Sequence, residues 1–381
     1  MNDKIKTVGM VTLYDDNFGT CLQAFALYNA IKELGCKPII IRYNRGNSKV
    51  ESSTGLSRII SRISDKNITQ IIQYIQNRKF IAARKAGFAK FKSNHFEFSS
   101  EQLYRDSDLT VLLNDFDTFV CGSDMIWSEE FEPDWDFFYI NFADTKRKIA
   151  FSPSFGKNEM TELNMAKSKE LIEKFAEKQR SCRDETGVAM IREKFGLTAY
   201  HTLDPTMLFD KQYWLKKVEN QGRLVNESYT LTYAFGGLKG PRHNIFRQVA
   251  KWNLGQTKTL CDFTDKNSIS GIVNDPFAFL RAFRDAEFIM TDTFHGLIFS
   301  LLFEKPFVCM EREDGGHWAK YADRMISTLK MLGLEDRYVN SKTNISDNFK
   351  HLDYTKVNEI LNEKRVDSWN FLKTALEESL S

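Results

Sequence analysis

The chain has 381 residues, of which 42% are hydrophobic, so it is long enough to form about two packed domains. Its 53 basic and 51 acidic residues leave a formal net charge of only +2, which excludes a general nucleic-acid binder with a large basic excess. No window approaches the ~20 apolar residues that span a bilayer, and the N-terminus carries charges too early for a signal peptide, so we expect a cytoplasmic protein.

The first half of the chain has the alternation of strands and helices that is typical of a doubly wound sheet. We expect strands over 6–13, 37–43, 117–121 and 147–155, and helices over 20–34, 59–92 and 162–177. The first helix is apolar at helical spacing and ends at Gly35, a common helix C-cap. The first strand, turn, helix and second strand therefore form the start of an α/β sheet.

Two strand ends in this half carry residues that are candidates for ligand contact. The polar turn after the first strand holds Asn17 and Gly19, and its single glycine excludes the dinucleotide fingerprint Gly-x-Gly-x-x-Gly. The third strand ends at Gly122, Ser123 and Asp124, where Asp124 is a candidate general base. The alternatives are a turn without further function at Asn17 and a helix-capping role for Asp124.

Two more positions in this half place polar or charged residues at a strand end. The strand over 147–155 ends in small polar residues that include Ser154. Arg183 follows a short strand and lies beside Asp184 and Glu185. An arginine among acids is normally a surface ion pair, whereas at the end of a central strand it would be a bidentate anion clamp.

The segment 78–92 holds six basic residues and no acidic residue. On a helix, Phe80, Phe88 and Phe91 share one face, although Arg84 intrudes on it. The ordinary interpretation is a solvated helix face. The alternative is a surface that contacts anionic lipid or a phosphorylated acceptor at the inner face of the membrane.

The second half of the chain is predicted to form a second α/β sheet after a hinge at 201–209, which contains Asp-Pro. We expect strands over 229–235, 257–262 and 287–290, and helices over 241–253, 277–284 and 296–303. A long amphipathic helix over 353–380 could pack back across the domain boundary. The predicted domains are residues 1–200 and 201–345, followed by the C-terminal helix at 346–381.

The corner between the strand over 287–290 and the next helix is the main candidate for ligand contact, because such a corner faces the ligand crevice of an open α/β sheet. Asp292, Thr293 and His295 lie here between two apolar runs. A helix N-terminus at Thr293–Gly296 offers backbone N–H groups to a phosphate or carboxylate, and His295 can exchange a proton near neutral pH. The alternatives are that Asp292 or Thr293 caps the helix and that His295 is a core histidine.

The six cysteines form no Cys-x-x-Cys pair and lie mostly in apolar runs, which indicates reduced, buried thiols. The sequence has no P-loop, His-Glu-x-x-His, Gly-x-Ser-x-Gly or zinc-ligand spacing. We therefore expect no metal and no cofactor. A metal site made by Asp292 and His295 is an alternative with little support in the pattern.

Five segments occur in a fixed order along most of the chain. They are NFGTCLQAFAL at 17–27, FVCGSDMIW at 119–127, AFSPSFG at 150–156, SCRDE at 181–185 with LDPT at 203–206, and TDTFHG at 291–296 with KPF at 305–307. As a set, in this order and at these spacings, they resemble the polysaccharide pyruvyl transferase family. Met125 and Ser128 depart from the residues common in that family.

The resemblance implies a GT-B-like pair of Rossmann-like domains that face a cleft. It implies transfer of pyruvate from phosphoenolpyruvate to two hydroxyls of a sugar as a cyclic ketal, with phosphoenolpyruvate as co-substrate and a sugar or lipid-linked oligosaccharide as acceptor. Arg183 and His295 match the residues that the family is expected to use for phosphoenolpyruvate. Arg324 resembles a further family arginine, although Asp323 precedes it where a serine is usual.

Two other functions fit the same pattern. A glycosyltransferase that uses a nucleotide sugar would occupy the same two-domain cleft. A non-catalytic carbohydrate- or anion-binding protein would keep the fold and bind ligand without turnover, because a fold alone does not select a function. Binding of phosphoenolpyruvate or of a nucleotide distinguishes the two enzymes.

Overall fold

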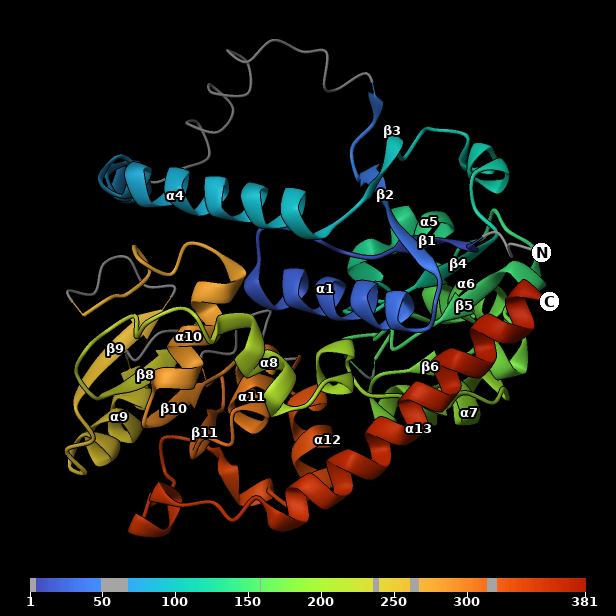
Figure 1. Cartoon of the computed structure of the whole chain (residues 1–381). Coiled ribbons are helices and arrows are strands. Elements are labelled where there is room, and N and C mark those ends of the chain that lie inside the picture. Colours follow the sequence, from blue (N-terminus) through green and yellow to red (C-terminus); the bar gives the residue numbers. More distant parts are fainter. Residues whose placement is uncertain (1–4, 49–67, 158, 236–239, 261–266, 314–320) are drawn as a thin grey trace.

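Two five-stranded parallel sheets, one in each half of the chain, form the framework of the computed structural model (Figure 1). The structure describes residues 5–48, 68–157, 159–235, 240–260, 267–313 and 321–381. Strands and helices alternate along the chain, because a parallel strand is reached only through a crossover connection. The fold is thus the predicted α/β pair of Rossmann-like domains in a GT-B-like arrangement.

The first sheet has the strand order β3-β2-β1-β4-β5. Its strands are β1 Thr7–Val11, β2 Lys37–Asn44, β3 Phe98–Tyr104, β4 Thr118–Cys121 and β5 Lys148–Ala150. The helices of this half are α1 Phe18–Glu33, α4 Ile68–His95, α5 Trp135–Phe138, α6 Glu162–Glu173 and α7 Glu185–Phe195, and a small pair of strands follows, β6 Ser181–Cys182 and β7 Tyr200–His201. The chain leaves β1 toward β2 and later returns to add β4 on the other side, so the order reverses between β1 and β4.

The second sheet has the strand order β12-β11-β10-β8-β9. Its strands are β8 Tyr229–Tyr233, β9 Gln256–Leu260, β10 Phe288–Thr291, β11 Phe307–Met310 and β12 Tyr338–Val339. The helices of this half are α8 Lys211–Val218, α9 His243–Ala250, α10 Pro276–Asp285, α11 Phe294–Leu302 and α12 Asp323–Leu332. Here the strand order reverses between β8 and β10.

The C-terminal helix α13, Thr355–Leu380, runs from the second half back to the first (Figure 1). Its apolar face is buried through Leu361, Leu372 and Ala375, which join a hydrophobic core that includes residues of both sheets. The indole Nε1 of Trp369 donates to the carbonyl of Leu208 at 3.0 Å, in the segment that connects the halves. The predicted packing of this helix across the boundary is confirmed.

Several predicted elements differ from the observed ones at their ends. The strand expected over 147–155 is limited to β5, because Ser152 has a φ of 54° that breaks the extended backbone. The helix expected from residue 296 begins earlier, at Phe294. Part of the predicted helix over 59–92 lies outside the described residues, and α4 continues to His95. The strands β3, β7, β11 and β12 and the helices α5, α7, α8 and α12 have no counterpart among the predicted elements.

The basic segment 78–92 lies on α4, and only part of it is solvated. Phe88 and Phe91 are buried on the inner face, whereas Phe80 is 44% exposed. Lys92 forms an ion pair with Asp16 at 2.7 Å, so at least one of the basic side chains serves an internal contact.

Five cysteines fall within the described residues; all are free and all but Cys36 are buried. The sixth, Cys261, lies outside those residues. No helix within the described ranges is long and apolar enough to cross a membrane.

Candidate functional site

A cavity of about 460 Å³ lies where the carboxyl ends of strands from the two sheets face each other. Arg45 follows β2, Arg312 follows β11 and Arg324 lies on α12, but most of the lining lies at or after the ends of β1, β4, β8 and β10: Leu13, Asp15, Asn17, Thr20, Asp124, Met125, Glu130, Phe131, Tyr233, Phe235, Thr293, Phe294 and His295. These strands are the two pairs at which the strand order reverses. In an open α/β sheet, ligands bind outside the strand ends at such a switch point.

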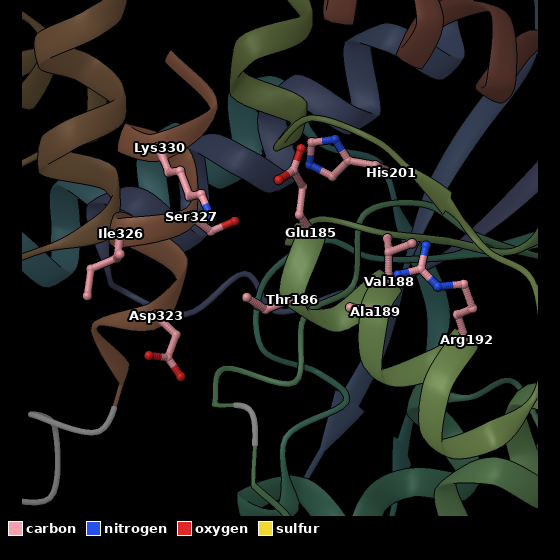
Figure 2. Close-up of a pocket in the computed structure, with 10 residues that line it drawn as sticks. All are labelled: Glu185, Thr186, Val188, Ala189, Arg192, His201, Asp323, Ile326, Ser327 and Lys330. Carbon is pink, nitrogen blue, oxygen red and sulfur yellow. The ribbon is translucent and has the colours of Figure 1, made fainter. Parts of the chain in front are cut away.

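A second cavity, of about 600 Å³, lies between α7 and α12. Figure 2 shows Glu185 and His201 on one wall and Ser327 and Lys330 on the other. The lining comes mainly from the two helices and not from the ends of the sheet strands. The first cavity, although it is the smaller, is therefore the candidate site. It lies at the switch points of both sheets, and buried charged side chains line it.

The second half supplies the first turn of α11 to the cavity wall. Thr293 is the N-cap of this helix, and its Oγ1 accepts a hydrogen bond from the backbone N–H of Gly296 at 2.9 Å. A side chain at Gly296 would not fit, because its Cβ would lie 2.0 Å from Oγ1 of Thr291. The positive end of α11 thus points at the cavity beside His295. Of the predicted alternatives, capping holds for Thr293.

Asp292 has a different role, since it binds arginines. Its Oδ2 lies 2.9 Å from Nη1 of Arg242 and 3.2 Å from Nε of Arg312, and its Oδ1 accepts from the backbone N–H of Phe235 at 2.9 Å. The carboxylate therefore holds Arg312 at the cavity wall. No group of three or more metal-ligating side chains occurs within the described part of the chain. A metal site at Asp292 and His295 is disfavoured, because two guanidinium groups occupy the carboxylate.

Two more guanidinium groups contact the Phe294 ring. Cζ of Arg183 is 4.4 Å and Cζ of Arg324 is 5.4 Å from the ring centroid. Such cation–π contacts stabilise both cations. Burial and the charge of Arg183 lower the pKa of Arg324 to about 10. Its Nε has no hydrogen-bond acceptor among the residues that the structure describes, so Arg324 is suited to receive an anion.

Arg183 itself lies behind the cavity wall. It is 4% exposed, and the described cavity lining does not include it. Nη1 donates to Oδ2 of Asp204 at 3.0 Å, and Nε lies 3.8 Å from Oδ1 of Asp184. Burial alone would lower the pKa of Arg183, but the carboxylates of Asp184, Asp204 and Asp124 raise it above its ordinary value. The sequence predicted direct anion contact; the structure places Arg183 where it supports Phe294 and Asp204.

Asp124 lies on the opposite wall, at the end of β4. Its Oδ2 accepts from Oγ1 of Thr20 at 2.8 Å and its Oδ1 from the backbone N–H of Met125 at 2.9 Å. Burial raises the pKa of the Asp124 carboxyl, but the charges of Arg183 and neighbouring cations outweigh burial and hold it below its ordinary value. Asp124 caps no helix, so that alternative is wrong; it is an ionised acceptor at the cavity surface.

The N-terminus of α1 contacts His295 directly. Asn17 is the N-cap of α1, and its Oδ1 accepts from the backbone N–H groups of Gly19 at 3.0 Å and Thr20 at 3.3 Å. A Cβ at Gly19 would lie 2.1 Å from Nδ1 of His295. The turn therefore has a function beyond its own geometry, because it brings the first half of the chain against the histidine of the second.

Three other candidates lie buried behind the wall and not at its surface. The backbone at Gly122 has a φ of 131°, and a Cβ there would lie 1.8 Å from the carbonyl oxygen of Phe151. Oγ of Ser123 donates to the carbonyl of Ser152 at 2.9 Å, and Oγ of Ser154 donates to Asp184. The predicted strand end holds for Gly122 and Ser123 after β4, whereas Ser154 lies beyond the end of β5 at Ala150. None of the three lines the cavity.

Sequence reasoning assigns no role in the site to several charged residues: Asp204, Arg312 and, in the cavity lining, Asp15, Arg45 and Glu130. Asp204 is part of the Leu-Asp-Pro-Thr segment, which the sequence analysis uses for the hinge and for the family resemblance. Arg312 follows β11, and its place depends on the buried Asp292 far away in the sequence. The signal for Asp204 was present in the segment, whereas no local pattern identifies Arg312.

One family model and several solved structures of low sequence identity match this chain. A family model described as polysaccharide pyruvyl transferase matches residues 17–314. A search of the curated proteins found no match. Among solved structures, UDP-GlcNAc 2-epimerase from Methanocaldococcus jannaschii has a TM-score of 0.48 at 10% identity and 94% coverage of both chains. A glycosyltransferase from Rickettsia africae has a TM-score of 0.41 at 10% identity, covering 98% of this chain and 99% of that chain.

Proposed function

The chain belongs to the polysaccharide pyruvyl transferase family, and we propose that it transfers pyruvate from phosphoenolpyruvate to two hydroxyls of a sugar as a cyclic ketal, releasing phosphate. One observation carries the proposal. The second half of the chain lines the cavity with Arg312, Arg324 and the first turn of α11, and the first half lines it with the ionised carboxylate of Asp124 and with Arg45. A trianionic donor fits the cationic groups of the second half, and the hydroxyls of an acceptor fit the carboxylate.

The donor has two anionic groups, a carboxylate and a phosphate. Arg324 and Arg312 both line the cavity, and guanidinium groups bind such anions through paired N–H groups. The first turn of α11 adds backbone N–H groups and a partial positive charge. We assign the two anionic groups to these three donors, with Arg183 behind Phe294 as electrostatic support.

The reaction starts with a proton at the methylene carbon of phosphoenolpyruvate. His295 donates this proton, the double-bond electrons form the new C–H bond, and the central carbon becomes electrophilic. A first sugar hydroxyl adds to that carbon, and the C–O bond to phosphate breaks. A second hydroxyl then closes the ketal. The two hydroxyls lose two protons: one restores His295 and the other leaves on phosphate. A positioned proton donor contributes ~10²–10⁴-fold to such a step.

Asp124 is placed to orient the acceptor. Its carboxylate is ionised at neutral pH because its pKa is held below the ordinary value. It therefore accepts a hydrogen bond from a sugar hydroxyl as the new C–O bond forms. Asp15 and Glu130 line the same side of the cavity and add further acceptors for sugar hydroxyls. We propose a neutral or lipid-linked sugar as acceptor, in the cytoplasm.

The donor assignment is tested by thermal unfolding with phosphoenolpyruvate. A ligand at ~100 times its dissociation constant stabilises the folded state by ~2.7 kcal/mol. We expect a clear rise in Tm for the native protein and a much smaller rise for Arg324→Lys, which keeps the charge but loses the planar fork. Arg192→Ala, an exposed arginine of α7, is the matched control and should behave as native. A rise in Tm with UDP-sugars and none with phosphoenolpyruvate would instead favour a glycosyltransferase.

A further inference from the structure

We infer that Asp204 is a positioning residue of the reaction: its carboxylate fixes the imidazole of His295 with Nε2–H toward Asp204 and Nδ1 toward the substrate. This inference rests on the proposed function. Asp204 lies in the segment that connects the two halves, directly before the short 3₁₀ helix Pro205–Leu208. It touches residues of the first half, of the connection and of the second half.

The Asp204 carboxylate is held by three hydrogen bonds and is fully buried. Oδ1 accepts from the backbone N–H of Thr206 at 3.0 Å and from its Oγ1 at 2.7 Å. Oδ2 accepts from Nη1 of Arg183 at 3.0 Å. A buried carboxylate with this many donors stays ionised and has one fixed orientation.

The same Oδ2 atom faces His295. The distance from Nε2 of His295 to Oδ2 of Asp204 is 3.6 Å. Nε2 is buried and has no hydrogen-bond partner among the described residues. Hydrogen bonds of catalytic groups are often long in ligand-free structures and shorten when substrate binds. Asp204 is thus the acceptor toward which this N–H points.

The other ring nitrogen has a different environment. Nδ1 lies against the N-terminus of α1, at Gly19, where Asn17 and Thr20 line the cavity together with His295. Because Asp204 takes the Nε2 side, Nδ1 is left for the substrate. After Nδ1 has given its proton to the methylene carbon, the neutral imidazole still carries Nε2–H toward Asp204.

The charges around His295 are mixed. Asp204 and Asp124 are the carboxylates that interact with it electrostatically. The cations of the same site include Arg183, Arg324, Arg312 and Arg45. Arg183 is bound to the same Asp204 oxygen, so the carboxylate is shared between a permanent cation and the histidine. The fixed orientation of the imidazole, and not charge alone, is what Asp204 supplies.

The competing explanation is purely structural: Asp204 would cap the 3₁₀ helix and pair with Arg183 without acting on His295. The two explanations differ in the imidazole tautomer. Nitrogen-15 NMR of the ring, with His295→Gln for assignment, reports which nitrogen carries the proton in the neutral form. We expect Nε2–H in the native protein. A native protein with the proton on Nδ1 would overturn the inference without any variant.

Variants then separate orientation from folding. In Asp204→Asn we expect the Nδ1–H tautomer to gain population and kcat to fall about 10²–10⁴-fold, the range for a positioned proton donor, with KM for phosphoenolpyruvate changed only a few-fold. Arg192→Ala, at an exposed position of α7 away from Asp204, is the control and should keep the native tautomer and kcat. Unchanged tautomer and kcat in Asp204→Asn would overturn the inference.

The design also separates this inference from the proposed function. A native protein that shows the Nε2–H tautomer but no turnover of phosphoenolpyruvate contradicts the proposed function and leaves the contact between Asp204 and His295 intact. Turnover with the wrong tautomer contradicts the role of Asp204 alone.

Discussion

At the scale of single residues, the site depends on one close approach between the two halves of the chain. The backbone of Gly19 lies against the imidazole of His295, and there is no room for a Cβ between them. The cap made by Asn17 fixes the position of that backbone. The absence of a side chain at Gly19 is therefore a condition for the orientation of His295.

Gly19→Ala is predicted to lower kcat strongly, because the added Cβ would lie 2.1 Å from Nδ1 of His295 and must displace the ring. Steady-state kinetics with phosphoenolpyruvate and an acceptor measure this effect. Gly222→Ala is the control, since a Cβ there meets nothing within 4 Å. Full activity in Gly19→Ala would show that the ring does not need its present position.

At the scale of elements, the sequence predicted the strands that end at the site, because each is an apolar run followed by a polar turn. β1, β4 and β10 are of this kind. β3 escaped prediction because it is a polar edge strand, FSSEQLY, with mostly solvated side chains. Arg312 could not be assigned locally, since its partner Asp292 is 20 residues away in the sequence. Asp204 lies in a recognised segment, but its role depends on Arg183, 21 residues away.

The connection between the 3₁₀ helix Glu129–Asp134 and α6 gives an element-scale prediction for pH. Oε1 of Glu129 accepts from the backbone N–H of Thr161 at 2.7 Å, and Oε2 lies 2.9 Å from Nζ of Lys157. Burial opposes ionisation, but these partners outweigh it and lower the pKa of Glu129 to about 2. The Glu129 carboxyl therefore takes up its proton at a higher pH in the unfolded chain than in the folded protein.

The contribution of Glu129 to the free energy of unfolding is thus fully present above about pH 4.5 and is lost as the pH falls toward 2. We expect the native protein to lose more free energy of unfolding between pH 6 and pH 3 than Glu129→Gln does. Urea unfolding at both values measures the difference. Glu170→Gln, in an exposed ion pair of α6, is the control and should track the native protein. Equal losses in the native protein and Glu129→Gln would contradict the prediction.

At the scale of the whole molecule, α13 joins the halves. Its buried face packs into a core shared by both sheets, and Oγ of Ser368 accepts from the backbone N–H of Leu203 at 3.0 Å, next to Asp204. The long C-terminal helix therefore supports the connection on which the site is built. Such packing ties the stability of the two halves together.

Leu372→Ala is predicted to lower the free energy of unfolding by about 2–5 kcal/mol, the cost of emptying a buried leucine site. Leu372 is fully buried on α13. Denaturant unfolding should show one transition that shifts as a whole. Val366→Ala, at a position of α13 that is 59% exposed, is the control and should change stability by less than ~0.5 kcal/mol. Two separate transitions would show that α13 does not couple the halves.

The position of Asp204 in the connection has a consequence for motion. If the halves rotate about the segment that joins them, displacement grows with distance from that axis. Asp204 lies on that segment, so its separations from Arg183 and His295 would change less than those between groups further from the connection. The opening could then widen for a bulky glycan while the atoms that exchange protons keep their separation. The selection of acceptors by size and the formation of the ketal bonds would then depend on different parts of the same cavity.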